Sequence, residues 1–287
     1  MIYINKFYCY DKAMINNIMQ DFSHLRTQVT RNYLKELFIR VDFDDIVEFD
    51  IGTEKAFTNC LRIKGYTDYQ GVASEINLSI VLKDNSFMQC NTGSRKAFVF
   101  IKDDKKVRIE ITPSAILLTK YGNFEEYNGL DEYKQTFLDV FNAINEKENI
   151  YIKQIGIKKI DAFEASNIIQ FKDLFEEFIT CDFMKNPLTD SINQTAKIIN
   201  FPINEYNVNY INRLKQGTLF VKNKLHDGYQ FLIEVDMYKD NNIAKEQLEE
   251  DITSMNNTLF NIFMSSFSSE TRDKIKDNIP IIEERVD

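Results

Sequence analysis

The stretch "ILLTKYGNFEEYNGLDEYKQTFLDVFNAI", residues 116–144, joins a short apolar strand pattern to a helical one. Over residues 130–144 apolar side chains recur three or four positions apart, as on one face of an amphipathic helix. Three rings at three-residue spacing lie at the joint, namely Tyr121, Phe124 and Tyr127. We expect a strand that turns into the helix covering it. The rings are then predicted to form the corner between sheet and helix rather than to hold a ligand, with Phe124 buried and with Tyr121 and Tyr127 keeping their hydroxyls in water.

Alternating apolar residues upstream of this stretch predict further strands. They are "ELFIRVDF" (36–43), "NLSIVL" (77–82), "KAFVFI" (96–101), "KVRIEIT" (106–112) and "AILLTKY" (115–121). Together these segments predict an antiparallel meander. Before them, apolar residues at helical spacing over residues 13–27 predict an N-terminal amphipathic helix.

The second half of the chain repeats this plan. The pattern predicts a strand over residues 150–163 with a bulge near Lys153 and Gln154, and a short helix over residues 168–178. Further predicted strands are "TAKIINF", "YNVNYINRL", "TLFVKN" and "YQFLIEVDMY", and "HDG" is predicted as the turn before the last of them. A long helix follows over residues 244–267.

The order of strands followed by a helix thus occurs twice. This predicts an α+β fold in which helices pack on one face of antiparallel sheet. We expect an N-terminal helical extension (1–30), a first α+β half (31–180) and a second half ending in the long helix (181–287). The three parts are expected to pack as one globular unit.

Composition limits the classes of function. With 44% hydrophobic residues among 287, the chain can bury a sizeable core. Its net charge of −9 argues against broad binding to nucleic acid or anionic membrane, which needs a basic surface. No apolar run reaches the length of a membrane span, and the first residues lack the pattern of a signal peptide.

Cysteine and histidine usage gives no sign of a metal or cofactor site. The four cysteines form no close pairs, and there are only two histidines, so a Cys/His zinc site is not predicted. Scattered free thiols are typical of a reducing cytosol, which makes the expected location cytoplasmic. Neither a P-loop nor a GxGxxG motif occurs, and we expect no cofactor.

His226 and Asp227 are the first pair considered for catalysis, since histidine is the usual general base near neutral pH. No nucleophile motif accompanies them, and "HDG" has the composition of a turn. The structural interpretation is therefore favoured, and we expect a protein without enzymatic activity.

Glu234 and Asp236 alternate along a predicted strand and so share one face, where they are weak candidates for a divalent metal. The acid-x-Lys spacing of many nucleases is absent, because Lys239 stands three residues after Asp236. A solvated strand face is the favoured interpretation.

Basic residues on neighbouring strands are weak candidates for a nucleic-acid surface. They are Lys105, Lys106, Arg108, Lys158 and Lys159. Phe98 and Phe100 lie among charges of the same region, in a basic-and-aromatic arrangement used to bind nucleic acid. Both rings also alternate as core residues do, so this function is an alternative and not the favoured one.

Several of these segments resemble a sporadically distributed family of bacterial proteins that lack an assigned activity. The resemblance rests on "ELFIRVDF", on the Tyr-x2-Phe-x2-Tyr joint in "ILLTKYGNFEEY", on "IKQIGIKKID" and on "LFNIFMSSFSSETRDKI". In the third motif Lys158 replaces the usual Arg and Asp161 the usual Asn. The patchy distribution of the family resembles that of defence or toxin–antitoxin genes.

Taken with this resemblance, the sequence predicts a non-enzymatic cytosolic protein that binds another protein, within a bacterial phage-defence or toxin–antitoxin-like system. One alternative is a nucleic-acid sensor or metal-dependent nuclease. Another is a phage-encoded inhibitor of host defence. The long helix over residues 244–267 is also a candidate surface for homodimerisation.

Overall fold

The computed structural model describes residues 3–4, 20–29, 33–46, 48–69, 78–83, 86–91, 97–102, 106–122, 129–171, 173–176, 194–221, 224–241 and 243–282. Within them a ten-stranded sheet forms the frame, in the order β1-β10-β11-β12-β9-β2-β8-β7-β6-β3. The strands are β1 (Tyr3–Ile4), β2 (Leu34–Phe43), β3 (Thr67–Tyr69), β6 (Phe98–Lys102), β7 (Val107–Thr112), β8 (Ala115–Tyr121), β9 (Ile152–Ala165), β10 (Gln194–Ile203), β11 (Tyr206–Val221) and β12 (Lys224–Lys239).

The sheet is antiparallel except where β1 pairs in parallel with β10. Its centre is β9, which pairs with β2 on one side and β12 on the other. The register between β2 and β9 shifts where Asp42 faces Gln154 and Phe43 faces Ile152. The extra residue is Lys153, so the predicted bulge is confirmed.

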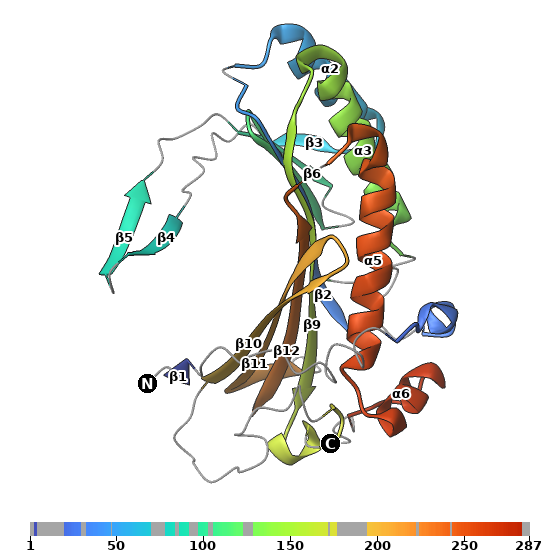
Figure 1. Cartoon of the computed structure of the whole chain (residues 1–287). Coiled ribbons are helices and arrows are strands. Elements are labelled where there is room, and N and C mark those ends of the chain that lie inside the picture. Colours follow the sequence, from blue (N-terminus) through green and yellow to red (C-terminus); the bar gives the residue numbers. More distant parts are fainter. Residues whose placement is uncertain are drawn as a thin grey trace.

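Helices cover one face of this sheet, as Figure 1 shows. They are α2 (Ile51–Ile63), α3 (Asp131–Glu148), α5 (Leu248–Ser265) and α6 (Ser269–Lys276), with short 3-10 turns η1 (Ser23–Leu25), η3 (Ile168–Phe171) and η4 (Lys245–Gln247). The strands-then-helix order recurs, first with α3 and then with α5. The predicted α+β class, with helices on one face of an antiparallel sheet, is confirmed.

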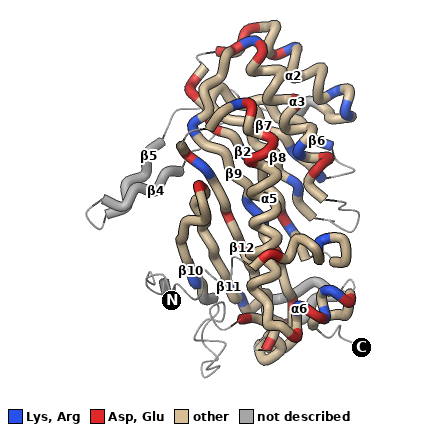
Figure 2. The backbone as a smooth tube through the Cα atoms, turned by 45° about the vertical axis from the view of Figure 1, so that its right-hand side comes forward, with Lys and Arg blue, Asp and Glu red and all other residues tan. Residues whose placement is uncertain are grey.

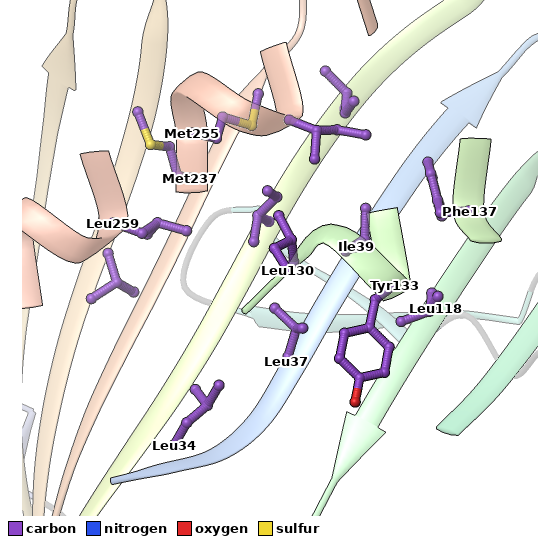
Figure 3. Packing of buried hydrophobic residues seen from close by; sticks show 14 of the residues in the cluster. Leu34, Leu37, Ile39, Leu118, Leu130, Tyr133, Phe137, Met237, Met255 and Leu259 are labelled. Carbon is purple, nitrogen blue, oxygen red and sulfur yellow. The ribbon is translucent and has the colours of Figure 1, made fainter. Parts of the chain in front are cut away.

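The core lies between the sheet and helices α3 and α5, and Figure 3 shows its central part. Phe137 of α3 points toward Ile39 and Leu118, whereas Met255 and Leu259 of α5 lie over Met237. Their side chains are at most 2% exposed. Each such buried side chain contributes roughly 1.5–3 kcal/mol relative to an exposed one, which explains why the two amphipathic helices stay on the sheet.

Local chemistry sets the ends of α2 and α3. Asp50 caps α2, since its carboxylate accepts a hydrogen bond from the Thr53 backbone N–H at 2.5 Å. Helix α3 has Asp131 and Glu132 in its first turn, where the helix dipole favours acids. It ends at Asn149, which takes the left-handed conformation (φ 46°) that asparagine tolerates.

The long C-terminal helix is shorter than predicted. Residues 245–247 form η4, and α5 spans Leu248–Ser265. Its apolar stripe is buried against the chain's own sheet, whereas Glu249, Glu250, Thr253 and Asn257 are exposed. A homodimer through this helix stays a prediction and would have to use that polar side.

Other local predictions were wrong. Helix α2 was not anticipated, and the described part of the predicted helix over residues 168–178 is only the 3-10 turn η3, followed by a bridge between Phe175 and Phe267. The segment "NLSIVL" contributes to a separate hairpin of β4 (Leu78–Lys83) and β5 (Ser86–Asn91), not to the large sheet. Of the predicted N-terminal helix, residues 13–19 lie outside the described residues and 23–25 form η1.

No helix in the described part of the chain is long and apolar enough to cross a membrane. Tyr121, at the end of β8, is 42% exposed, whereas Phe124 and Tyr127 lie outside the described residues.

Candidate functional site

The side of the large sheet that faces away from α3 and α5 is the candidate site, and we call it the uncovered face. Strand register places its residues in rows. One row crosses four strands through Phe38, Lys158, Asp236 and Asn209, since each faces the next across its ladder. No described helix lies on this face (Figure 1).

Glu234 is the centre of the charges on the uncovered face. One carboxylate oxygen lies 2.5 Å from the Lys158 ammonium, and the other lies 3.2 Å from a guanidinium nitrogen of Arg213. The Glu234 side chain is only 11% exposed, whereas those of Lys158 and Arg213 are 33% and 37% exposed. One enclosed carboxylate thus holds two cations that reach solvent.

Lys158 also contacts an aromatic ring. Its ammonium lies 5.6 Å from the centroid of Phe38, within the range of a cation–π interaction. In the neighbouring part of the same face, Arg40 donates to both carboxylate oxygens of Asp42, at 2.7 to 3.0 Å. Such forked contacts hold a guanidinium in a defined orientation.

Asp236 completes this group. Burial raises the pKa of its carboxyl above the ordinary value, and the hydrogen bond from Asn209 (3.4 Å) and the charges of Lys158 and Arg40 oppose that rise. The carboxyl is therefore easier to protonate than a solvated aspartate, although it lies among cations.

Gly156 lies in the next row of the uncovered face, between Arg40 and Tyr238. A Cβ atom placed on it would come within 3.1 Å of the Met237 carbonyl oxygen and 3.2 Å of the Tyr238 Cβ. Glycine is needed there because the neighbouring strand approaches closely. This explains the glycine of "IKQIGIKKID" in structural terms.

Basic and acidic side chains are nearly balanced on the uncovered face among the described residues. The basic ones are Arg40, Arg108, Lys158, Arg213 and Lys215, and the acidic ones are Glu36, Asp42, Glu110, Glu164, Glu234 and Asp236. Arg108 pairs with Glu110, and Gln230 donates to Glu164 at 3.1 Å. Over the described chain as a whole, Figure 2 shows basic and acidic residues interspersed along the backbone. The face has no broad excess of positive charge.

Lys159, the neighbour of Lys158, points to the helix-covered side. It faces Leu37 and Val235 across its two ladders, and its ammonium donates to Asn256 Oδ1 of α5 at 2.7 Å. Burial lowers the pKa of Lys159 to about 8 and raises the pKa of Asp161, two residues further on, to about 7. The two residues thus have opposite charges in a weakly solvated place, where each charge favours the ionised form of the other.

Arg26 joins this interior polar group from η1. Its guanidinium donates to the Asn256 carbonyl at 2.9 Å and to Asn257 Oδ1 at 2.8 Å, and it lies over the ring of Phe260. The contacts fasten the η1 segment to α5.

A second interior ion pair fixes the start of α5. Lys239 of β12 lies 3.1 Å from Asp251 and 2.9 Å from Glu205, and the Tyr206 hydroxyl donates to Asp251 at 3.1 Å. Sequence reasoning missed Asp251 and Asn256, and it named Lys159 only as a candidate for a nucleic-acid surface, not as an interior residue. The only signal for Lys159 was its position in the apolar phase of β9, two residues after Ile157.

The weak catalytic candidates lie away from the charged centre. Contrary to the predicted turn, His226 and Asp227 belong to β12, where they face Leu219 and Thr218 of β11. The chain reverses between Val221 and Lys224 instead. Asp227 is exposed, and the His226 side chain lies outside what the structure describes.

The other candidates are only partly brought together. Glu234 and Asp236 share the uncovered face as predicted, but cations occupy both oxygens of Glu234. Lys158 and Lys159 point to opposite faces. Lys106 adopts a positive φ (48°) just before β7, and Lys105 lies outside the described residues.

In the described ranges, no group of three or more His, Cys, Asp or Glu side chains is arranged to hold a metal ion. No family model matches the chain, and no curated protein is similar to it.

Proposed function

We propose that this chain is a cytoplasmic, non-enzymatic component that binds a partner protein through the uncovered face. The observation that carries the proposal is that four of the five basic residues described on this face are paired with carboxylates. Arg40, Arg108, Lys158 and Arg213 each lie within ion-pair distance of a carboxylate on the same face.

This paired state favours protein over nucleic acid. Nucleic-acid binding draws its free energy from cations that neutralise phosphates, and cations already paired with carboxylates must first give up those pairs. A protein surface with its own mixture of charges can instead match both signs and select its partner by electrostatic complementarity.

The apolar residues between the charges support the same proposal. Phe38, Leu117, Ile160, Ile211 and Leu232 lie on the uncovered face by register and are partly exposed. Apolar area between oriented charged groups is the usual composition of protein interfaces. The partner we propose is a folded protein whose contact surface carries both acidic and basic residues around apolar ones.

The resemblance to a patchily distributed bacterial family is the reason to place this partner within a phage-defence or toxin–antitoxin-like system. A phage-encoded inhibitor of host defence would also bind protein, and the neighbouring genes would distinguish the two. The alternative from a different functional class is a nucleic-acid sensor or a metal-dependent nuclease.

The test uses the purified full chain and a partner identified by co-purification from the native host and then purified separately. Arg213→Glu reverses one charge of the uncovered face, whereas Lys64→Glu reverses one on the helical side, where Lys64 pairs with Asp139 at 2.7 Å. We expect calorimetric binding of the partner to be lost in the first variant and kept in the second. Equal binding by both variants would reject the uncovered face, and salt-dependent binding of the chain to RNA or DNA would favour the alternative.

A further inference from the structure

Lys159 of β9 and Lys239 of β12 both point to the helix-covered side of the sheet, but their electrostatic surroundings differ. The Lys239 ammonium lies 3.1 and 3.2 Å from the two carboxylate oxygens of Asp251 and 2.9 Å from Glu205. Burial alone would lower the pKa of Lys239, but its bonds to Glu205 and Asp251 raise that pKa above the ordinary value. Lys239 is therefore an ammonium that its counter-ions keep charged.

Lys159 has the opposite surroundings. Within the described residues its ammonium forms no close ion pair and donates instead to the neutral amide oxygen of Asn256, at 2.7 Å. The backbone carbonyl of the same Asn256 accepts a hydrogen bond from Arg26, so a second cation lies nearby. Burial and the charge of Arg26 lower the pKa of Lys159 to about 8, although Asp161 opposes this shift. A substantial share of this amine is thus neutral at pH 7.5 to 8.

A neutral lysine amine is a nucleophile, and a neighbouring cation is one of the ways in which proteins produce it. Lys159 also keeps part of its surface in contact with solvent. The surrounding charges decide which electrophile suits it. A Schiff base with an aldehyde or ketone carries no negative charge and gains nothing from Arg26. Addition of CO2 gives an anion, which turns the repulsion between Lys159 and Arg26 into attraction.

We propose that Lys159 reacts with CO2 to form a carbamate that pairs with Arg26. The amine nitrogen attacks the carbon of CO2, and a new N–C bond forms. One C=O π bond opens, and its electron pair passes to oxygen. Starting from the ammonium, the nitrogen releases two protons to water, so the step requires no oxidant, reductant or cofactor.

Asp161 adjusts its own charge to this product. It lies two residues after Lys159 on the same side of β9. Burial raises the pKa of Asp161 to about 7, and the charge of Lys159 opposes that rise. When the ammonium becomes a carbamate this opposition ends, so the pKa rises further and Asp161 takes up a proton. The carbamate then has no anion beside it on β9.

The carbamate adds an attraction to an existing contact between η1 and α5. Arg26 already joins the two through its bonds to Asn256 and Asn257. CO2 is thus a ligand that stabilises this side of the molecule. The reaction needs no partner protein and lies on the opposite side of the sheet from the uncovered face. The inference therefore goes beyond the proposed function, and the two are tested independently.

The test incubates the purified full chain with carbon-13 bicarbonate at pH 8 and traps carbamates as ethyl esters with triethyloxonium. Peptide mass spectrometry then locates the label. We expect the ester on Lys159 and not on Lys158 or Lys239 of the same sample, whose ammonium groups are paired with carboxylates. Peptide mapping also separates this product from that of the α-amino group, which is partly neutral at this pH.

Two variants examine the role of the charges. Arg26→Gln removes the cation but keeps an amide donor, and should lower the trapped fraction on Lys159 about fivefold. Lys159→Arg keeps the positive charge without a reactive amine. Bicarbonate should raise the melting temperature of the wild type relative to chloride at equal ionic strength and pH, and should leave that of Lys159→Arg unchanged. Circular dichroism confirms that each variant is folded.

The proposal is overturned by a wild-type chain without an ester on Lys159, or by equal labelling of Lys158 and Lys159. Both results are read from the wild type and do not depend on the folding of any variant. An unchanged trapped fraction in Arg26→Gln would likewise reject the pairing of the carbamate with Arg26.

Discussion

Lys158 and Lys159 are adjacent in the sequence but lie on opposite faces of the sheet. Lys158 reaches the uncovered face, where Glu234 and the Phe38 ring contact it and solvent remains nearby. Lys159 reaches the helix-covered side, donates to Asn256 of α5, and has its pKa lowered by burial. The comparison teaches that neighbouring lysines of one strand can have different environments, one at the uncovered surface and one against a helix.

The largest expected effect separates these two lysines. Lys159→Met should lower the free energy of unfolding by about 3 kcal/mol, because Asn256 Oδ1 loses its donor and Asp161 loses its cation. Lys158→Met should cost at most about 1 kcal/mol, since its ion pair is partly solvated. Urea unfolding near neutral pH measures both, and equal losses would contradict the difference between the faces.

The loss of unfolding free energy caused by Lys159→Met should depend on pH. The pKa of Asp161 is raised to about 7 in the folded chain from an ordinary 3.8, so this group favours the folded state when protonated, and that contribution is lost as the pH rises toward 7. The pKa of Lys159 is lowered to about 8, so its contribution is lost as the pH falls through 8.

Both shifts therefore make Lys159→Met least costly in acid. At pH 5 we expect most of the loss in unfolding free energy seen at neutral pH to disappear. Asp161 is then protonated in the variant and no longer needs a cation. The wild type, in contrast, still carries a poorly solvated ammonium on Lys159. Unfolding of the two chains at pH 5 and pH 7.5 checks this expectation. A loss that is the same at both values would show that Asp161 and Lys159 are not coupled.

A smaller effect is expected where the uncovered face itself is tightly packed. Gly156→Ala should cost about 1–3 kcal/mol, since its Cβ would press on the Met237 carbonyl and on Tyr238. Gly217→Ala in β11 is the matched control, because nothing lies within 4 Å of the added Cβ. Thermal unfolding measures both, and a tolerated Gly156→Ala would mean that the neighbouring strand yields easily.

Much of the architecture could be predicted from periodicity. Helix α3 and the bulge at Lys153 were identified from spacing, because both depend on which residues of a short segment are apolar. Helix α2 was missed because "IGTEKAFTNCLRI" contains a glycine, two threonines and an asparagine, which are weak helix formers, and only Thr53, Phe57 and Leu61 are buried. Packing of α2 against α3 overrides this weak propensity.

The prediction of a turn at "HDG" was wrong for a related reason. Its composition fits a turn, but Gly228 faces Gly217 in a ladder that continues to Val221 and Lys224. Strand pairing over a long hairpin outweighs the preference of three residues. The shared face of Glu234 and Asp236 was predictable from alternation, whereas the cations that hold Glu234 come from β9 and β11 and required the register.

The sequence by itself determined the alternation of strands and helices, the α+β class and the pairs of side chains that share a strand face. These follow from chain geometry over a few residues. The tertiary structure decided which face the helices cover, and that Lys159 points to the helix-covered side while Lys158 points away from it. Those facts depend on contacts between residues far apart in the chain, and the periodicity of a single strand is the same whichever of its faces becomes buried.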